Sequence, residues 1–209
     1  MKHFILMSDI IESRQKPQNI LISNFKKCTK HINDKFRKKM VSPLTITLGD
    51  EFQGLILDLK SAIQIILEIE EFIIENNLQM KLRYVLYYGE IETNINNKIA
   101  FEMLGSGLST ARNTLIKLKK QDNRFYIDIS NETKNIILNN SFKIYQNILD
   151  RWKVNLEYKL ISSFIKEQDY KVVSEKLNKN RSLMWKREKS LNISSYFSTK
   201  EILIATTNI

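Results

Sequence analysis

The sequence predicts an α+β fold whose last part is entirely helical. Over residues 1–130, short apolar runs typical of strands alternate with segments of helical periodicity. Beyond residue 130 the strand signals stop, and the pattern stays helical up to Asn192. Only 5 of the 209 residues are Gly and 2 are Pro, so we expect few loops and long regular elements.

The first predicted elements are a strand, a helix and a hairpin. Residues His3–Met7 form a short apolar run typical of a buried strand. Over residues 19–40, apolar side chains recur at helical spacing, which predicts an amphipathic helix. The β-type runs Leu44–Leu48 and Phe52–Leu57 flank Gly49-Asp50-Glu51, a sequence typical of a tight hairpin turn.

The next elements continue the alternation of helices and strands. A helix is predicted over residues 60–76, a strand over 81–88, a helix over 109–120 and a strand over 124–129. This order is typical of an antiparallel sheet with helices on one of its faces. We therefore expect residues 1–130 to form a palm domain of the ferredoxin-like type.

The C-terminal part differs from the palm in pattern and in charge. Helices are predicted over residues 131–147, 152–166, 170–177 and 181–191. Residues 151–209 carry 12 Lys and Arg against 6 Asp and Glu, a net charge of +6. Residues 1–150 carry 21 against 17, a net charge of +4. We place a boundary near residue 150, with 131–150 as a connecting helix and 151–209 as an all-α domain.

Composition excludes several classes of protein. The single Cys28 cannot form an intrachain disulfide, and no Cys or His cluster has the spacing of zinc ligands. His3 and His31 stand far apart, which leaves little material for a Ser-His-Asp hydrolase. The formal charge of +10 favours anionic partners such as nucleic acid or phosphorylated ligands, although Lys and Asn recur along the whole chain.

We expect no membrane association. The apolar stretch Phe4–Met7 is interrupted at once by Ser8 and Asp9, which is too soon for the core of a signal peptide. The most apolar region, residues 55–74, carries five charged side chains and cannot span a bilayer as one apolar helix. The sequence therefore predicts a cytoplasmic protein.

Two aspartates are candidates for a metal site. Asp9 ends the first predicted strand and Asp50 lies in the hairpin turn. If that strand pairs with the hairpin, both carboxylates lie at one edge of the sheet. Carboxylate oxygens are the ligands that Mg²⁺ and Mn²⁺ prefer, and such ions can hold a triphosphate. The structural alternative is that both aspartates only cap turns.

Two further segments suit the binding of phosphate. Ile10-Ile11-Glu12-Ser13-Arg14 follows Asp9, and the backbone of such a turn can hold an anion with help from a hydroxyl and a guanidinium. Gly105-Ser106-Gly107 opens a helix in which Arg112 lies about one turn further on. The alternatives are a solvated loop for the first segment and close packing of helix on sheet for the second.

These segments resemble the SatD family, small bacterial proteins whose N-terminal part is similar to the palm of class III and GGDEF-type nucleotidyl cyclases. The matching residues are Asp9 to Arg14, Leu48-Gly49-Asp50-Glu51-Phe52-Gln53-Gly54, and Gly105 to Arg112. The resemblance covers most of the chain in order and spacing. The Gly-Asp-Glu-Phe-Gln-Gly segment is its most specific part.

The resemblance implies a role for each segment. Asp9, Asp50 and the carbonyl of Ile10 would bind the metal, Mg²⁺ or Mn²⁺. A nucleoside triphosphate would be held by the following residues: Ile10, Ile11, Glu12, Ser13, Arg14, Gly49 and Arg112. Arg112 would act catalytically, facing the phosphates from the partner subunit of a homodimer.

Two positions depart from the cyclase pattern. Leu108 stands where cyclases usually have asparagine, and Ile46 stands where many have a base-reading lysine. These departures favour a nucleotide sensor, whereas retention of both aspartates favours an active nucleotidyl cyclase or nucleotidyltransferase. Both interpretations stay open here.

The C-terminal part suits a helix-turn-helix. Residues 170–177 and 181–191 form the two helices, with the small Ser174 facing the partner helix and Asn178 in the turn. Met184, Trp185 and Leu191 would supply the apolar packing, because an Arg stands where a further anchor is expected.

SatD-like proteins are expected to carry such a motif, which favours binding of double-stranded DNA. The candidate DNA-binding residues are Lys179, Asn180, Arg181, Ser182, Lys186, Arg187 and Lys189. A helical packing domain with a basic solvated face is the alternative. The sequence thus predicts a nucleotide-responsive regulator with a metal-dependent palm site and a DNA-binding tail; the alternative is an active cyclase.

Overall fold

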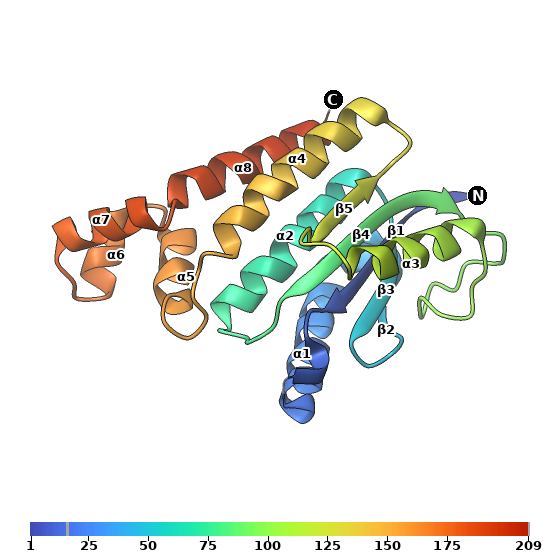
Figure 1. Cartoon of the computed structure of the whole chain (residues 1–209), viewed down its shortest axis with the longest axis horizontal. Coiled ribbons are helices and arrows are strands. Elements are labelled where there is room, and N and C mark those ends of the chain that lie inside the picture. Colours follow the sequence, from blue (N-terminus) through green and yellow to red (C-terminus); the bar gives the residue numbers. More distant parts are fainter. Residues whose placement is uncertain (16, 209) are drawn as a thin grey trace.

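A computed structural model describes residues 1–15 and 17–208 and shows one five-stranded sheet with helices on both sides (Figure 1). The strands are β1 (Lys2–Ile10), β2 (Met40–Ile46), β3 (Glu51–Ile56), β4 (Leu82–Glu90) and β5 (Phe125–Asp128). Their order in the sheet is β2-β3-β1-β4-β5. β1 pairs antiparallel with β3 and β4, β2 pairs antiparallel with β3, and β5 pairs parallel with β4. The predicted α+β class is confirmed.

The described residues form eight α-helices. They are α1 (Gln18–Phe36), α2 (Leu59–Glu75), α3 (Ser106–Leu118), α4 (Glu132–Leu149), α5 (Tyr158–Glu167), α6 (Tyr170–Lys176), α7 (Arg181–Ser190) and α8 (Ile193–Thr206). Short 3₁₀ turns occupy Ser13–Gln15 and Arg37–Lys39. None of these helices is long and apolar enough to cross a membrane.

Side chains of β1 alternate between two hydrophobic clusters. Leu6 and Ile10 pack with α1, α2 and the C-terminal helices, whereas Ile5 and Met7 pack with α3. Successive residues of a strand point to opposite faces of its sheet, so α3 covers the face opposite to α1 and α2. The prediction that all palm helices share one face was therefore wrong for α3.

Several predicted boundaries shift; the helix predicted over residues 152–166, for example, begins only at Tyr158 as α5. The first helix ends at Phe36, and the chain passes through a 3₁₀ turn before Met40 opens β2. The hairpin turn covers residues 47–50, because Glu51 is already the first residue of β3 and pairs with Asp9 of β1. Gly49 lies in this turn with a φ of 81°, a backbone conformation that glycine adopts without strain.

The helix α8 is an element that the sequence pattern did not predict. It runs beside α4 and returns the chain from the outer helices α5, α6 and α7 to the palm (Figure 1). Tyr196 of α8 stacks on Tyr145 of α4 with ring centroids 5.5 Å apart, and its hydroxyl donates a 2.6 Å hydrogen bond to Glu71 of α2. The hydrophobic core is therefore continuous across residue 150, where the sequence predicts a domain boundary.

A buried ion pair joins α2 to the start of β5. The guanidinium of Arg124 makes two contacts with the Glu70 carboxylate, at 3.2 and 3.1 Å, and also donates to the carbonyl of Leu82. The Tyr84 hydroxyl donates a 2.8 Å hydrogen bond to the same carboxylate. Burial, together with the neighbouring Glu70 carboxylate, raises the pKa of Tyr84 well above its usual value.

Candidate functional site

A row of charged residues crosses the α3 face of the sheet. Asp9 of β1 pairs with Glu51 of β3 on one side and with Arg83 of β4 on the other. Asp9 lies two residues after Met7 and four after Ile5, whose side chains pack under α3, so its side chain points to the same face of the sheet. Its strand partners Glu51 and Arg83 point to that face as well. We call Asp9, Glu51 and Arg83 the charged row.

Lys119, the C-cap residue directly after α3, completes this group. Its ammonium lies 3.3 Å from Asp9 Oδ2 and 2.9 Å from Glu51 Oε1. Arg83 approaches the same Asp9 Oδ2 at 3.3 Å. The Asp9 side chain is only 3% exposed, and its other oxygen, Oδ1, is buried without a hydrogen-bond partner among the described residues. One oxygen of Asp9 is thus shared by two cations and the other has none.

Burial dominates the electrostatics of Asp9. It raises the pKa of this carboxyl, and the Glu51 carboxylate adds to the effect, although Lys119 and Arg83 oppose it. Burial would by itself lower the pKa of Lys119, but hydrogen bonds and charges from Glu51 and Asp9 outweigh it and raise that pKa. An additional cation at Asp9 would relieve the cost of keeping this carboxylate charged.

Asp50 reaches the same sheet edge through the hairpin turn. The amide of Ile10, the residue after Asp9, donates a 2.9 Å hydrogen bond to the Asp50 carbonyl. The Ser13 hydroxyl donates at 2.6 Å to Asp50 Oδ2. The two aspartates therefore lie at neighbouring strand ends, as their positions in the sequence predict, and Ser13 orients the second carboxylate.

In the predicted phosphate-binding turn, part of the backbone already makes hydrogen bonds within the chain. The amide of Ile11 donates a 2.8 Å hydrogen bond to the carbonyl of Lys81, so it does not point to a ligand. Glu12 takes a positive φ of 56° and is exposed, as is Arg14. The stretch Glu12–Arg14 is the part of the predicted segment that stays accessible at this edge.

Arg112 lies on the same face as the charged row. Its guanidinium is 3.6 Å from Glu51 Oε2 within the same chain, and its side chain is 40% exposed. Close packing explains the two glycines ahead of it, because a Cβ on Gly105 or Gly107 would lie under 3.0 Å from the backbone of Glu90. Both glycines thus serve the approach of α3 to β4.

A polar cavity of about 460 Å³ opens beside the charged row. Arg83 lines it and also contacts Asp9, so the cavity and the row share a side chain. The other lining residues are Ile11, Glu12, Gln79, Met80, Lys81, Gln121, Asp122, Arg124, Asp150 and Val154. Its volume lies within the range of pockets that hold small ligands.

The donor set at this edge suits a hard divalent cation, although it is small. No group of three or more His, Cys, Asp or Glu side chains in residues 1–15 and 17–208 is arranged to hold a metal ion. Asp9 and Asp50 offer two carboxylates, and the unpartnered Oδ1 of Asp9 is an oxygen that a cation would satisfy. These residues fit Mg²⁺ or Mn²⁺, with remaining positions left for ligand oxygens.

Glu51, Arg83 and Lys119 are site residues that the sequence did not predict. The predicted hairpin placed Glu51 in its turn, whereas the observed register puts it beside Asp9. Arg83 had a usable signal, because it is a charged residue between the buried Leu82 and Tyr84 of a strand. No sequence signal identifies Lys119, since it reaches the charged row only because α3 packs on the sheet.

The helices α6 and α7 pack against each other and are joined by a short turn. Ser174 is buried where the two helices meet, and its carbonyl accepts a 2.8 Å hydrogen bond from the Lys179 amide. Asn178 takes the left-handed conformation, with a φ of 50°. Met184 and Leu191 are buried as predicted, but Trp185 is 47% exposed and does not supply the predicted packing.

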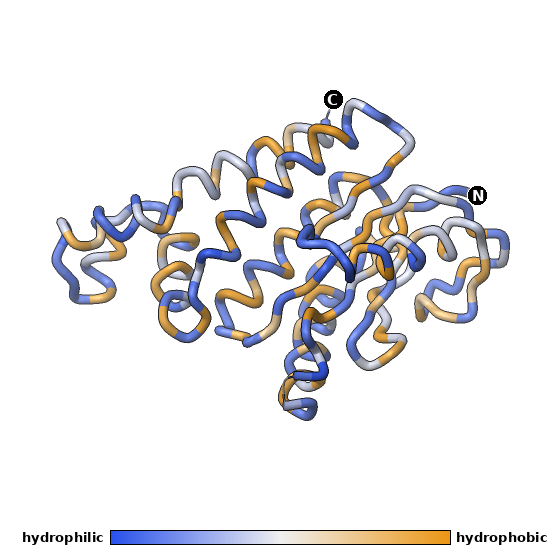
Figure 2. Tube along the Cα trace, in the orientation of Figure 1, coloured by the Kyte–Doolittle hydropathy of each residue, from blue (hydrophilic) through white to orange (hydrophobic). Residues whose placement is uncertain are grey.

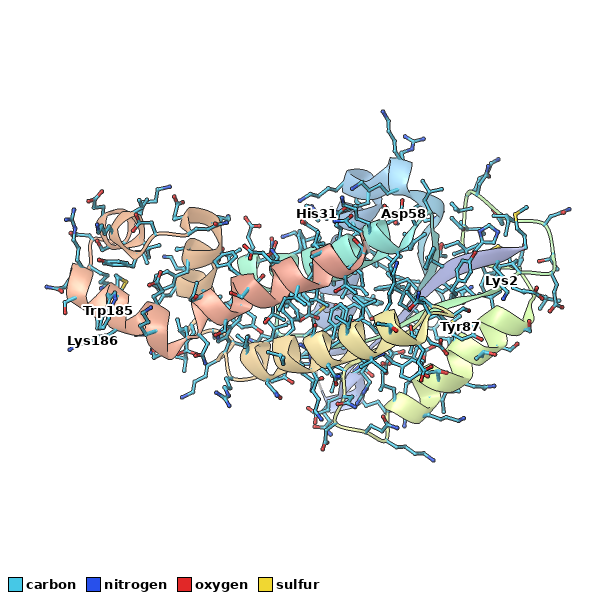
Figure 3. The ribbon with its side chains drawn as sticks, turned by 90° about the horizontal axis from the view of Figure 1, so that it is seen from above. Lys2, His31, Asp58, Tyr87, Trp185 and Lys186 are labelled. Atoms are coloured by element: carbon cyan, nitrogen blue, oxygen red, sulfur yellow. The ribbon has the colours of Figure 1, made fainter. Side chains whose placement is uncertain are left out.

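The outer surface of α7 is polar and basic. Figure 2 shows hydrophilic residues concentrated around the turn between α6 and α7. In Figure 3, Trp185 and Lys186 lie at the end of the molecule opposite to Lys2 and Tyr87 of the sheet. The exposed residues among the DNA-binding candidates are Lys179, Asn180, Arg181, Ser182, Lys186 and Lys189.

The side chains of Asn180, Arg181 and Arg187, all DNA-binding candidates, contact other groups of the described residues. Asn180 caps α7 by accepting hydrogen bonds from the amides of Ser182 and Leu183. Arg181 pairs with Glu175 at 2.5 Å, and both side chains are exposed. Arg187 is half-buried and pairs at 2.5 Å with Glu157, the residue before α5, which explains why an Arg stands at this otherwise apolar position.

Comparisons with solved structures return nucleotide cyclases at low similarity. A bacterial light-regulated adenylyl cyclase matches with a TM-score of 0.42 and 15% identity, over 60% of this chain and 74% of that one. The catalytic core of a rhodopsin-guanylyl cyclase with converted specificity, in complex with ATPαS, matches with a TM-score of 0.41 and 14% identity, over 61% and 78%. The comparison with curated proteins gives no match.

The family comparison covers nearly the whole chain. The model of the SatD family matches residues 3–207, a range that includes the charged row, the hairpin and all the C-terminal helices. The resemblance stated from the three sequence segments is thereby confirmed. The chain belongs to the SatD family.

Proposed function

We propose that this chain binds a nucleoside triphosphate together with Mg²⁺ or Mn²⁺ at the edge of its palm. The observation that carries the proposal is the buried Asp9, whose Oδ1 has no partner among the described residues, next to Asp50 at the neighbouring strand end. A buried carboxylate oxygen without a partner is costly unless a cation or donor satisfies it. The cavity of about 460 Å³ beside the row offers room for part of the ligand.

Each residue of the site has a distinct proposed role. Asp9 and Asp50, with the Ile10 carbonyl, would hold the metal, which neutralises phosphate charge and orients the triphosphate when bound. Ser13 keeps the Asp50 carboxylate oriented through its 2.6 Å hydrogen bond. The backbone of Glu12–Arg14 and the side chain of Arg14 would face the phosphates, with Gly49 keeping the hairpin turn open beside them.

We further propose that the bound nucleotide regulates the protein rather than being turned over. Ile46 and Leu108 stand at positions where the cyclase pattern has polar residues that serve the base and the reaction. The alternative is a nucleotidyl cyclase in which the ribose 3′-hydroxyl attacks the α-phosphate, with Arg112 supplied by the partner of a homodimer. Incubation with the four nucleoside triphosphates and Mn²⁺, followed by mass spectrometry, separates the two: a sensor leaves the triphosphates intact.

Calorimetry tests the binding site itself. Wild-type protein should bind at least one nucleoside triphosphate much more tightly with Mn²⁺ than without it, and Asp50→Asn should lose most of that difference. The exposed Asp34→Asn on α1 is the matched control and should behave as wild type. Equal affinity with and without Mg²⁺ or Mn²⁺ in the wild type would overturn the proposal.

A second proposed function is binding of double-stranded DNA by α6 and α7. The observation that favours it is the left-handed Asn178 between two packed helices, with the exposed Lys179, Lys186 and Lys189 on and before the second helix. Lysines on the outer face of such a helix can contact phosphates and base edges. Together, the two proposals describe a cytoplasmic regulator that responds to a nucleotide.

A further inference from the structure

Lys119 occupies the position of a counter-ion in the charged row. Its ammonium lies within 3.3 Å of Asp9 and 2.9 Å of Glu51, so it bridges two carboxylates that face each other across β1 and β3. Two neighbouring carboxylates repel each other unless a cation lies between them. Lys119 therefore supplies, within the chain, charge that a bound divalent cation would otherwise supply.

The packing of α3 brings Lys119 to this place. Leu108, Ala111, Leu115 and Leu118 are buried at helical spacing against the sheet. Lys119 is the next residue, the C-cap of the helix, where a cation is also favoured by the helix dipole. Its backbone is thus fixed by the core, while its side chain is long and 37% exposed.

Lys119 and Arg83 differ in how readily they can leave Asp9. The Arg83 side chain projects from β4, which lies between β1 and β5, and is 15% exposed. The Lys119 side chain is a flexible stem with a compact charge at its end and reaches the row from its rim. A cation arriving at Asp9 would therefore displace Lys119 and leave Arg83 in place.

We propose that Lys119 makes the palm selective for a metal ion that arrives together with phosphate. This inference rests on the proposed function. A free divalent cation must compete with the tethered Lys119 ammonium for Asp9, which weakens its binding. A metal ion bound to a triphosphate brings anionic oxygens with it, and these give the displaced ammonium a new partner. Metal and nucleotide therefore bind cooperatively through Lys119.

The test measures binding of Mn²⁺ alone by electron paramagnetic resonance. Lys119→Met removes the charge and keeps the stem, and Lys120→Met is the matched control, because Lys120 is exposed and loses the same charge. We expect Lys119→Met to bind Mn²⁺ about tenfold more tightly than the wild type and Lys120→Met. Unchanged melting temperatures would establish that all three proteins are folded.

Calorimetry with nucleoside triphosphates distinguishes a wrong role for Lys119 from a wrong proposed function. In the wild type, saturating Mn²⁺ should strengthen nucleotide binding by a larger factor than in Lys119→Met. If Lys119→Met matches the wild type in Mn²⁺ affinity while Asp50→Asn loses metal-dependent nucleotide binding, the role of Lys119 is overturned and the proposed function stands. If none of the proteins binds Mn²⁺ with or without nucleotide, both are overturned.

Discussion

At the scale of single residues, Cys28 shows how burial controls reactivity. The side chain is 1% exposed on the inner side of α1. Burial raises the pKa of its thiol to about 12, with the nearby carboxylates of Glu70 and Glu68 adding to the shift. The thiolate, which is the reactive form, is therefore scarce at neutral pH.

We predict that Cys28 resists modification in the folded protein. At pH 8 an aromatic disulfide reagent should label it only as fast as the chain opens, and labelling should become immediate in denaturant. Absorbance of the released thiol measures the rate, and Cys28→Ser gives the background. Labelling of the native protein at the rate of a free thiol would contradict the buried position of this residue.

The charged row shows how far residues alone predict a site. The sequence predicts Asp9 and Asp50 at one sheet edge because each follows an apolar run, and the structure places them there. Glu51 belongs to the row only through the register of β1 and β3, and a shift of one residue would turn it to the other face. Register is set by the whole hairpin, which is why residue types did not identify Glu51.

At the scale of elements, the Glu70–Arg124 pair joins α2 to β5 inside the core. The Arg124 side chain is 4% exposed and that of Glu70 is 7% exposed, so solvent screens their interaction only weakly. Removing Glu70 leaves a buried guanidinium that keeps its hydrogen bond to the Leu82 carbonyl and has the partly exposed carboxylate of Asp150 3.3 Å from its Nε.

We predict that Glu70→Gln lowers the free energy of unfolding by roughly 3–5 kcal/mol, since it strands a buried guanidinium. Urea denaturation followed by circular dichroism measures the decrease. Glu75→Gln on the same helix is the matched control: its partner Lys166 is exposed, so we expect a decrease of under about 1 kcal/mol. Equal decreases in the two variants would show that Glu70 does not compensate the charge of Arg124.

Some predicted helix starts agree with the structure because one continuous apolar stripe defines the helix. The helices α1 and α2 begin within one residue of their predicted starts, because their buried faces are continuous. The stripe of α8 is broken by buried Thr199 and Thr206, whose hydroxyls donate to the carbonyls of Ser195 and Ile202. Its hydrophobic pattern was therefore too weak to predict a helix.

At the scale of the whole molecule, the net charge of +10 is carried by two basic regions. One is the C-terminal part that includes α7. The other is the end of α1 and the following turn, where seven Lys and Arg stand against one Asp in residues 26–39. All seven of these cations are exposed. Either surface could attract a polyanion, so experiments on DNA must distinguish them.

We predict that duplex DNA binds through α7. In the full chain, Lys186→Gln with Lys189→Gln should weaken binding and reduce the slope of log affinity against log salt by about 0.9 for each phosphate that the variant no longer neutralises. Lys26→Gln with Lys30→Gln on α1 removes the same charge and should leave the slope nearly unchanged. Fluorescence anisotropy at several salt concentrations measures both slopes, and the reverse ranking would place the duplex on α1.

The return of α8 to the palm has a consequence for synthesis of the protein. Tyr196 contacts Glu71 across 125 residues of sequence, so part of the palm core is completed by residues synthesised long after the sheet. On the ribosome, residues 1–190 can form the sheet and its first helices, but Tyr145 and its neighbours on α4 stay uncovered until α8 emerges. The palm core is therefore completed only after α8 has left the ribosome, and a chain that stops before α8 would expose this apolar surface to aggregation.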